Sequence, residues 1–394
     1  MKKLKIGMFM DSWYPDINGV ILVMENLLKN MKDYADVTLI VPKMEKSNID
    51  DSMYPFKIIR VDSIPLVVSK YRLGLVDLEY LKLKKLFKKY DFDIIHIHSP
   101  FALGRLGIRV AREKNIPVVA TMHTRWEFEF KKYLKSKKVA NLIVKHLIKS
   151  FNKCDSCIAL NNSLMKVYDD YGYTGKYKII NNGTDLQIVK NKKKALERVN
   201  NLFKLDKNEI LFLFVGRIIE VKNIFFILDV LKELKRRKFK FKMIYVGDGP
   251  DYKELCKKVK DYGMSKEIIL AGKILDRELL EEIYYRANLF LFPSLFDSSS
   301  LVQIEAASQE TPTLFLEGAV TADTVENNIN GFTAKYDVNL FADRIEEIMN
   351  NRKLYNKVSS NAKKDLAKSW KEISLETYKH YLNIINEYKK NTNK

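Results

Sequence analysis

The sequence predicts an α/β protein with two doubly wound parallel sheets. Short apolar segments recur along its 394 residues, and helical patterns separate most of them. Strands that are apolar on both faces and spaced by helices are typical of parallel sheets covered on each side. The chain is too long for one ordinary single-core domain, and its length suits two domains of common size.

The expected strands fall into two groups along the chain. In the first half they are Leu4–Met10, Asp36–Val41, Phe56–Val61, Asp93–His98, Pro117–Met122, Ser156–Leu160 and Lys178–Asn181. In the second half they are Ile210–Val215, Lys242–Val246, Ile268–Ala271, Leu289–Phe292, Thr311–Leu316 and Gly331–Ala334. After Phe341 the pattern is helical to the end of the sequence.

The two groups meet near residue 185, where a polar, turn-rich segment precedes the next strand. We therefore expect a first Rossmann-like domain at residues 1–184, a second at residues 185–365, and a C-terminal helix at residues 366–394. Ligands of such sheets bind outside the carboxyl ends of the strands. The two domains are expected to face each other across a ligand-binding cleft.

Composition narrows the class of protein and its compartment. No apolar run reaches the roughly 18 residues that a membrane span needs. Asp11 interrupts the N-terminal stretch before the apolar region of a signal peptide develops, so a buried first strand explains it better. The lone pair of Cys154 and Cys157 lacks the further ligands of a zinc site. We expect a cytoplasmic protein with no bound metal.

The formal charge of +20 comes from 69 basic and 49 acidic residues, and part of it is concentrated in residues 131–153. Lysines and apolar residues interleave there without any acidic residue, which predicts a basic amphipathic helix pair. Such segments bind anionic membrane surfaces, and a solvated helix face above a packed one is the alternative. We favour peripheral binding to the inner face of the membrane. Nucleic acid is not expected, because no aromatic-basic stacking pattern accompanies the lysines.

One candidate site follows the strand Ile210–Val215. Gly216, Arg217 and Lys222 lie in the segment FVGRIIEVKNI, where a helix begins after the strand. Arg, Lys and helix N-terminal amides can together neutralise a diphosphate without a metal ion. The residues therefore predict a diphosphate site, and an ordinary solvated loop is the alternative.

A second candidate site lies in FPSLFDSSSLVQIEAAS. Asp297 and Glu305 flank a small polar loop and the start of a helix at Leu301. One carboxylate can meet sugar hydroxyls and the other a ribose, while the amides of Ser299, Ser300 and Leu301 point at phosphate. The alternative is a capping Asp followed by an ordinary helix Glu.

Three weaker signals each follow an expected strand. Gly19 and Val20 begin a helix, and a glycine there lets the backbone approach a ligand closely. His123 lies at a strand end, where a side chain is well placed to touch substrate. Gly247, in the tight loop VGDGP, could seat a nucleotide base. A helix start, a structural histidine and a plain turn are the respective alternatives.

Taken in order, these motifs resemble family 4 of the retaining glycosyltransferases, which have the GT-B fold. The resemblance covers nearly the whole chain and is strongest from Ile210 to Phe332, where VGR…E-x-K-N, GDGP, the FPSLFD segment, TP and NGF appear in the family's order. It implies that Arg217 and Lys222 hold the diphosphate of the donor. It also implies that Asp297 contacts the donor sugar and Glu305 the ribose.

The resemblance further implies that His123 touches the transferred sugar and that residues 18–20 close over the donor phosphates. The donor is expected to be a nucleotide diphosphate sugar, above all a UDP-sugar, with no cofactor or metal required. The acceptor is expected to be a membrane lipid or a cell-envelope glycan precursor. The C-terminal helix is expected to cross back to the first domain.

Attack on the front face of the sugar would retain its configuration, with the departing phosphate oxygen taking the proton. The sequence departs from the family in two places. Asp297 stands where the family has Glu, and Ser298–Ser300 stands where it has G-F-G. The serines keep the backbone amides but reduce the space beside them. A non-catalytic subunit of a glycosyltransferase complex is therefore the alternative function.

Overall fold

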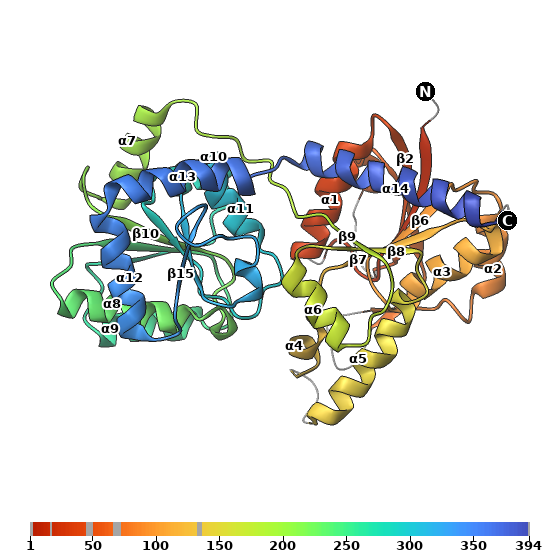
Figure 1. Ribbon diagram of the computed structural model, residues 1–394, viewed down its shortest axis with the longest axis horizontal. Coiled ribbons are helices and arrows are strands. Elements are labelled where there is room, and N and C mark those ends of the chain that lie inside the picture. The colour runs from red at the N-terminus through yellow and green to blue at the C-terminus, as the bar shows by residue number, and fades with distance from the viewer. Residues whose placement is uncertain (1–2, 16–17, 45–49, 66–71, 132–135, 393–394) are drawn as a thin grey trace. The chain divides into compact units, whose positions relative to one another are not determined.

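The computed structural model describes residues 3–15, 18–44, 50–65, 72–131 and 136–392. The chain divides into two compact units, which we call the first unit (residues 1–182 and 370–394) and the second unit (residues 183–369). Figure 1 shows that each unit has its own central sheet covered by helices. The sequence patterns placed the domain boundaries after residues 184 and 365, and the structure divides the chain after residues 182 and 369.

The sheet of the first unit is parallel throughout and has the strand order β3-β2-β1-β6-β7-β8-β9. Every strand expected in the first half of the chain is present, with small differences at the ends. The strands are β1 (Leu4–Phe9), β2 (Ala35–Pro42), β3 (Lys57–Val61), β6 (Ile94–Ile97), β7 (Val118–Met122), β8 (Ser156–Ala159) and β9 (Tyr177–Ile179). The helices are α1 (Gly19–Met31), η1 (Asp51–Met53), α2 (Tyr80–Lys88), α3 (Ala102–Lys114), α4 (Trp126–Lys131), α5 (Lys137–Phe151), α6 (Asn162–Asp170) and α14 (Trp370–Thr392).

The sequence patterns missed one element of the first unit. Strands β4 (Ser63–Pro65) and β5 (Arg72–Gly74) form a short antiparallel pair outside the main sheet. Each strand has three residues, and β4 is largely exposed. A run that short and polar carries no periodicity that distinguishes a strand from a loop.

The sheet of the second unit is also parallel and has the order β12-β11-β10-β13-β14-β15. All strands expected in this half are present. They are β10 (Leu211–Val215), β11 (Lys242–Val246), β12 (Ile268–Gly272), β13 (Leu289–Leu291), β14 (Thr313–Leu316) and β15 (Phe332–Ala334). The helices are α7 (Lys192–Phe203), η2 (Glu220–Lys222), α8 (Ile224–Arg236), α9 (Tyr252–Asp261), α10 (Arg277–Arg286), α11 (Leu301–Ser308), η3 (Val320–Ala322), α12 (Val338–Asn350) and α13 (Arg352–Leu366).

Both sheets have the strand order of a doubly wound fold, so the predicted fold class of two parallel-sheet α/β domains is confirmed. In the first unit the order reverses between β1 and β6, and in the second unit between β10 and β13. Ligands of open α/β sheets bind beside the carboxyl ends of the strands at this reversal. The loops that follow these four strands are therefore the places to look for function.

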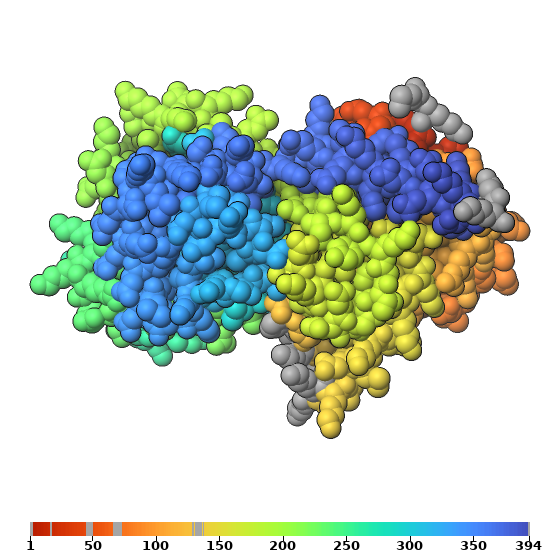
Figure 2. Space-filling model, in the orientation of Figure 1, coloured from red at the N-terminus to blue at the C-terminus, as the bar shows by residue number. Residues whose placement is uncertain are grey.

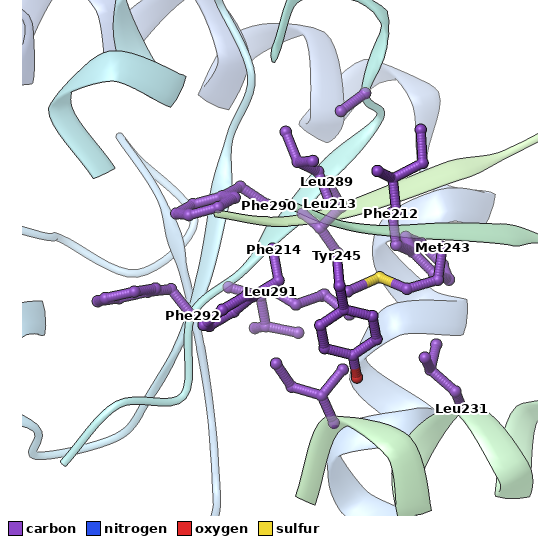
Figure 3. Close-up of a cluster of buried hydrophobic side chains, with 14 of the residues drawn as sticks. Phe212, Leu213, Phe214, Leu231, Met243, Tyr245, Leu289, Phe290, Leu291 and Phe292 are labelled. Atoms are coloured by element: carbon purple, nitrogen blue, oxygen red, sulfur yellow. The ribbon is translucent and has the colours of Figure 1, made fainter. Parts of the chain in front are cut away.

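An aromatic core holds the strands of the second unit in place. Phe212, Phe214, Phe290 and Phe292 are fully buried on or beside the neighbouring strands β10 and β13 (Figure 3). The rings of Phe290 and Phe292 stack with centroids 5.5 Å apart. Burying each such side chain stabilises the fold by about 1.5–3 kcal/mol. The loops at the strand ends therefore start from a rigid base.

Helix α14 belongs to the first unit, although it follows the second unit in sequence. Its buried residues Trp370, Ile373, Thr377, Tyr381 and Ile384 recur at helical spacing and form one face. The helix packs on α1 and crosses the surface of the first unit, as the dark blue segment in Figure 2 shows. Burial of this apolar face explains why the chain returns to the first unit.

Of the predicted basic helix pair at residues 131–153, the described residues contain one helix, α5, because α4 already ends at Lys131 and carries Glu127 and Glu129. Two lysines of the predicted pair, Lys132 and Lys135, lie outside the described residues. Cys154 and Cys157 follow α5, and both side chains are buried in the first unit. Within the described ranges, no helix is long and apolar enough to cross a membrane.

Candidate functional site

Two loops of the second unit pack backbone against backbone beside β10. The amide of Gly216 donates to the carbonyl of Val246 at 3.0 Å, and the amide of Ile218 donates to that of Asp248 at 3.0 Å. Gly247 has φ +140°, and a Cβ built on it would lie 1.8 Å from the carbonyl oxygen of Gly216. Only glycine fits there, so the GDGP motif has a structural reason in addition to its predicted contact with a base.

Lys222 and Asp297, which lie in different loops, meet in the second unit. Lys222 ends η2, and its Nζ lies 3.0 Å from Oδ1 of Asp297. The hydroxyl of Ser294 donates to Oδ2 of Asp297 at 2.7 Å, and the ammonium also lies over the Phe292 ring. Both side chains are less than one-fifth exposed. Each charge is thus neutralised by the other, and a bound diphosphate would have to share Lys222 with Asp297.

Arg217 differs from Lys222 in its surroundings. It is exposed, and its guanidinium has no hydrogen bond or ion pair to any residue that the structure describes. A guanidinium has five donors arranged to suit phosphate oxygens. Arg217 is therefore the cation of this loop that is ready to bind an anion without breaking an existing contact.

Glu305 is buried near the middle of α11 and has two partners. Its Oε2 accepts a hydrogen bond from the hydroxyl of Tyr284 at 3.0 Å, and its Oε1 lies 3.2 Å from Arg277. Arg277 also contacts Asp185 at 2.7 Å. Burial raises the pKa of the Glu305 carboxyl, and the charge of Arg277 opposes this shift. The sequence patterns missed Arg277 and Tyr284, because nothing in the spacing of α10 relates them to α11.

The N-terminus of α11 has no side-chain cap among the described residues. Ser300 is the N-cap with an extended backbone, and among the described contacts its side chain makes no capping hydrogen bond. The first amides of a helix lack partners within the helix, and they favour an anion. Ser298 and Ser300 are both buried, so their side chains fill part of the space that two glycines would leave. Leu301 begins the helix as expected.

In the first unit, His123 lies against a second histidine that the sequence patterns missed. Nε2 of His123 is 3.0 Å from Nδ1 of His98, and the rings are nearly parallel. Burial lowers the pKa of His123 to about 4 and lowers that of His98 as well. Both imidazoles are therefore neutral near pH 7, and one donates a hydrogen bond to the other. The buried Nε2 of His98 has no partner among the described residues.

A third histidine anchors this pair to the C-terminal helix. His96 lies on β6, and His98 follows directly after the end of that strand. Residues two positions apart point to the same face of a strand. The ring nitrogens of His96 lie 2.6 Å from the hydroxyl of Tyr381 on α14 and 2.7 Å from that of Thr121 on β7. The alternation His-Ile-His in a strand was the sequence signal that could have identified the cluster.

Asp11 connects the carboxyl ends of β1 and β6. Its carboxylate accepts hydrogen bonds from the Ser99 hydroxyl at 2.5 Å and from the amides of Leu103 at 2.8 Å and Gly104 at 3.3 Å. Burial raises the pKa of Asp11, and these hydrogen bonds oppose that shift. The contacts hold the start of α3 beside β1, which gives Asp11 a structural role.

The start of α1 is closed by its own cap. The side-chain oxygen of Asn18 accepts hydrogen bonds from the amides of Val20 and Ile21, each at 3.0 Å. Gly19 begins the helix as predicted, and a Cβ built on it would meet no atom within 4 Å. The resemblance implies that residues 18–20 close over the donor phosphates, and a phosphate that took the Val20 amide would have to displace Asn18.

Comparison with known proteins identifies the chain. A model described as Glycosyltransferase Family 4 matches residues 17–188, and one described as Glycosyl transferases group 1 matches residues 197–365. The chain belongs to glycosyltransferase family 4. The transferase class and the family predicted from the motifs are thus confirmed.

Relatives and solved structures agree with this assignment. The transferase is 27% identical over 415 residues to the alpha-monoglucosyldiacylglycerol synthase of Acholeplasma laidlawii, covering 99% of this chain and all of the relative. It is 26% identical over 317 residues to the synthase of that name from Streptococcus pneumoniae, covering 79% of this chain and 70% of the relative. The crystal structure of HepE from Anabaena in complex with UDP has a TM-score of 0.77 at 14% identity, covering 96% of this chain and 100% of HepE. That likeness shows the fold.

The structure therefore gathers the predicted residues of the transferase into two groups. In the second unit, Arg217, Lys222 and Asp297 lie in the loops that follow β10 and β13, at the reversal of strand order. In the first unit, His123 follows β7 and meets His98 after β6. Among the described residues, no group of three or more His, Cys, Asp and Glu side chains could hold a metal ion.

Proposed function

We propose that the chain is a retaining glycosyltransferase that moves a hexose from a UDP-sugar to a membrane lipid. The observation that carries the proposal is the cationic loop of the second unit beside the open N-terminus of α11. Two positive side chains and the first amides of a helix, which have no partners within that helix, suit a diphosphate leaving group. The alpha-monoglucosyldiacylglycerol synthases support a diacylglycerol acceptor and glucose as the sugar, and the UDP complex of HepE supports UDP as the nucleotide.

The donor would rearrange the contacts around Lys222. As the diphosphate arrives, Lys222 would turn from Asp297 to a phosphate oxygen, and Arg217 would bind a second oxygen. Asp297 would then accept hydrogen bonds from sugar hydroxyls, and Glu305 from the ribose. A positive charge held near the leaving phosphate lowers the barrier because negative charge grows there as the bond breaks.

The acceptor hydroxyl would attack on the face from which the diphosphate leaves. Its proton would pass to the departing phosphate oxygen, so no enzyme carboxylate needs to act as base. The sugar would carry positive charge in the transition state, as in glycoside hydrolysis. Neutral His123, whose pKa is lowered to about 4, can hydrogen-bond to a sugar hydroxyl without adding repulsion to that charge.

Helix α5 supports the membrane part of the proposal. Val144, Leu147, Ile148 and Phe151 on one face are buried in the first unit. On the other face, Leu142 is 70% exposed and lies among exposed Lys138, Lys145 and Lys149. Figure 2 shows this yellow helix projecting from the body of its unit. An exposed leucine surrounded by lysines suits the interface of an anionic bilayer.

The donor test compares thermal stabilisation and transfer with UDP-, GDP- and ADP-sugars. We expect a UDP-sugar to stabilise the wild type and to label diacylglycerol in vesicles, and we expect Glu305→Ala to lose both effects. Glu347→Ala on α12 is the matched control, because it removes an exposed helical carboxylate that is not part of the loops after β10, β11 or β13. If no nucleotide sugar stabilises the wild type and a partner enzyme co-purifies with it, the non-catalytic subunit replaces this proposal.

The membrane test uses vesicle flotation with Leu142→Asp. We expect the variant to lose binding to phosphatidylglycerol vesicles while keeping stabilisation by the nucleotide sugar. Leu340→Asp is the control, since Leu340 is an exposed leucine on α12 of the second unit. Equal flotation of both variants and the wild type would show that α5 does not contact the membrane.

A further inference from the structure

A pocket of about 250 Å³ lies along helix α3 in the first unit. Its wall runs from Ala102 to Arg112 on α3, and it is completed by Val76 and Asp77 before α2 and by Ser150 and Lys153 at the end of α5. None of the residues predicted to bind the sugar donor lines it. The lining is therefore distinct from the residues predicted to bind the donor, although Ala102 begins α3 directly after the loop that follows β6.

The pocket is strongly basic. Arg105, Arg109 and Arg112 recur at helical spacing on one exposed face of α3, and Lys153 adds a fourth cation. The only acid in the lining is Asp77, whose carboxylate lies 3.8 Å from Arg109. Like charges gathered on one surface repel each other, so a bound anion would stabilise this arrangement.

The arginines differ in how firmly they are held. The guanidinium of Arg109 stacks on the Tyr80 ring at 4.0 Å and faces Asp77. The guanidinium groups of Arg105 and Arg112 have no hydrogen bond or ion pair to another side chain in the part of the chain that the structure describes. Arg105 acts on Asp11 and Arg112 on Asp155 through charge alone, so these two guanidinium groups, about two helical turns apart on the same face, keep their hydrogen-bond donors for a ligand.

The lining combines these cations with apolar side chains. Val76, Ala102, Leu106 and Ile108 are buried residues of the pocket wall. Arginine forks match phosphate oxygens in pairs, and an apolar wall accepts the carbon part of an ester. A ligand that satisfies both is a phosphate group attached to an organic body.

We propose that this pocket binds a phosphate ester through Arg105 and Arg112, at a site distinct from the sugar donor. The ester can come from the headgroup of an anionic lipid, since α5 ends in the pocket, or from a soluble metabolite. The shared chemistry is the phosphate. The proposal does not depend on the transfer reaction, because no residue of the donor loops takes part.

The test uses the full chain with the double variant Arg105→Gln/Arg112→Gln. Its matched control is Lys88→Gln/Lys114→Gln, which removes two positive charges from α2 and the end of α3, outside the pocket lining. One arm measures calorimetric binding of glycerol 3-phosphate. The other measures flotation with phosphatidylglycerol vesicles against phosphatidylcholine vesicles. We expect affinity to fall about tenfold or more for each lost arginine contact and to change little in the control.

The two arms identify the source of the phosphate. Loss of glycerol 3-phosphate binding in the double variant supports the site with a soluble ester, and selective loss of vesicle binding supports it with a lipid headgroup. Equal losses in the double variant and the lysine control would overturn the proposal, because they would show a general effect of charge. Failure of the wild type to bind either probe would also overturn it. Stabilisation by the nucleotide sugar, measured on the same samples, reports the donor site separately.

Discussion

In the second unit, the loops beside β10 and β13 pair a cation with a carboxylate, whereas in the first unit the loops after β6 and β7 bury neutral histidines. Lys222 and Asp297 form an ion pair in which Nζ lies 3.0 Å from Oδ1. His98 and His123 pair with each other and with no charged side chain that the structure describes, and burial lowers the pKa of both. Equivalent edges of two similar sheets thus carry an ion pair in one unit and a pair of neutral imidazoles in the other.

The helix N-termini at these edges differ in the same way. Asn18 closes α1 by accepting from the amides of Val20 and Ile21, whereas Ser300 makes no such side-chain bond at α11. An open N-terminus attracts an anion, and a capped one offers it fewer donors. The comparison favours the second unit as the place where the diphosphate binds.

The largest expected effect comes from removing Lys222, the cation that pairs with Asp297 in the second unit. We expect Lys222→Met to lower the rate of sugar transfer by about 10²–10³-fold, as loss of one donor to a developing negative charge does in other enzymes. Initial rates with a UDP-sugar and lipid vesicles measure this effect.

Lys242→Met is the control for that variant. Lys242 lies at the start of β11, at the opposite end of the strand from the loops of the site. A transfer rate for Lys222→Met equal to that of the control would contradict the assignment of the diphosphate to the second unit.

The pH dependence of the free energy of unfolding tests the buried histidines of the first unit. We expect the change in this dependence to be intermediate in size. The pKa of His123 falls to about 4 in the folded protein from its ordinary value of 6.5. The unfolded chain therefore binds more protons between these values, so the free energy of unfolding should decrease as pH falls from 6.5 to 4. We expect His123→Asn to reduce this loss, measured by denaturant unfolding at several pH values.

The histidine on the surface of the same unit supplies the control for that measurement. His146 lies on the exposed face of α5, and His146→Asn makes the same substitution outside the buried cluster, so a change of equal size in both variants would contradict the assignment to His123. An unchanged acid sensitivity in His123→Asn would show that the buried histidine is not the group that titrates.

The smallest expected effect concerns the cap of α1. We expect Asn18→Ala to lower the free energy of unfolding by about 1 kcal/mol, and Asn18→Gly to lower it by only a few tenths, because glycine tolerates the cap position. Thermal or denaturant unfolding measures both variants. If Asn18→Ala also strengthens binding of UDP, the Val20 amide takes part in the donor site once it is released. Unchanged UDP binding would leave the diphosphate with the second unit alone.

Much of the fold was predictable because strand and helix periodicities are local properties of a sequence. The apolar segments at Ile210–Val215 and Lys242–Val246 identified β10 and β11. The three-residue strands β4 and β5 carried no comparable signal. The motifs around Arg217, Asp297 and Glu305 identified the family, because their order along the chain is itself a sequence property.

The tertiary structure alone decided which of these residues meet. Lys222 reaches Asp297 because β10 and β13 are neighbours in the sheet, although they are far apart in sequence. Arg277 pairs with Glu305 because α10 and α11 pack together, and His98 meets His123 because β6 lies beside β7. Residue types and their spacing determine local chemistry, whereas strand order and helix packing determine partners. Burial then shifts the pKa of these groups, downward for His123 and upward for Glu305.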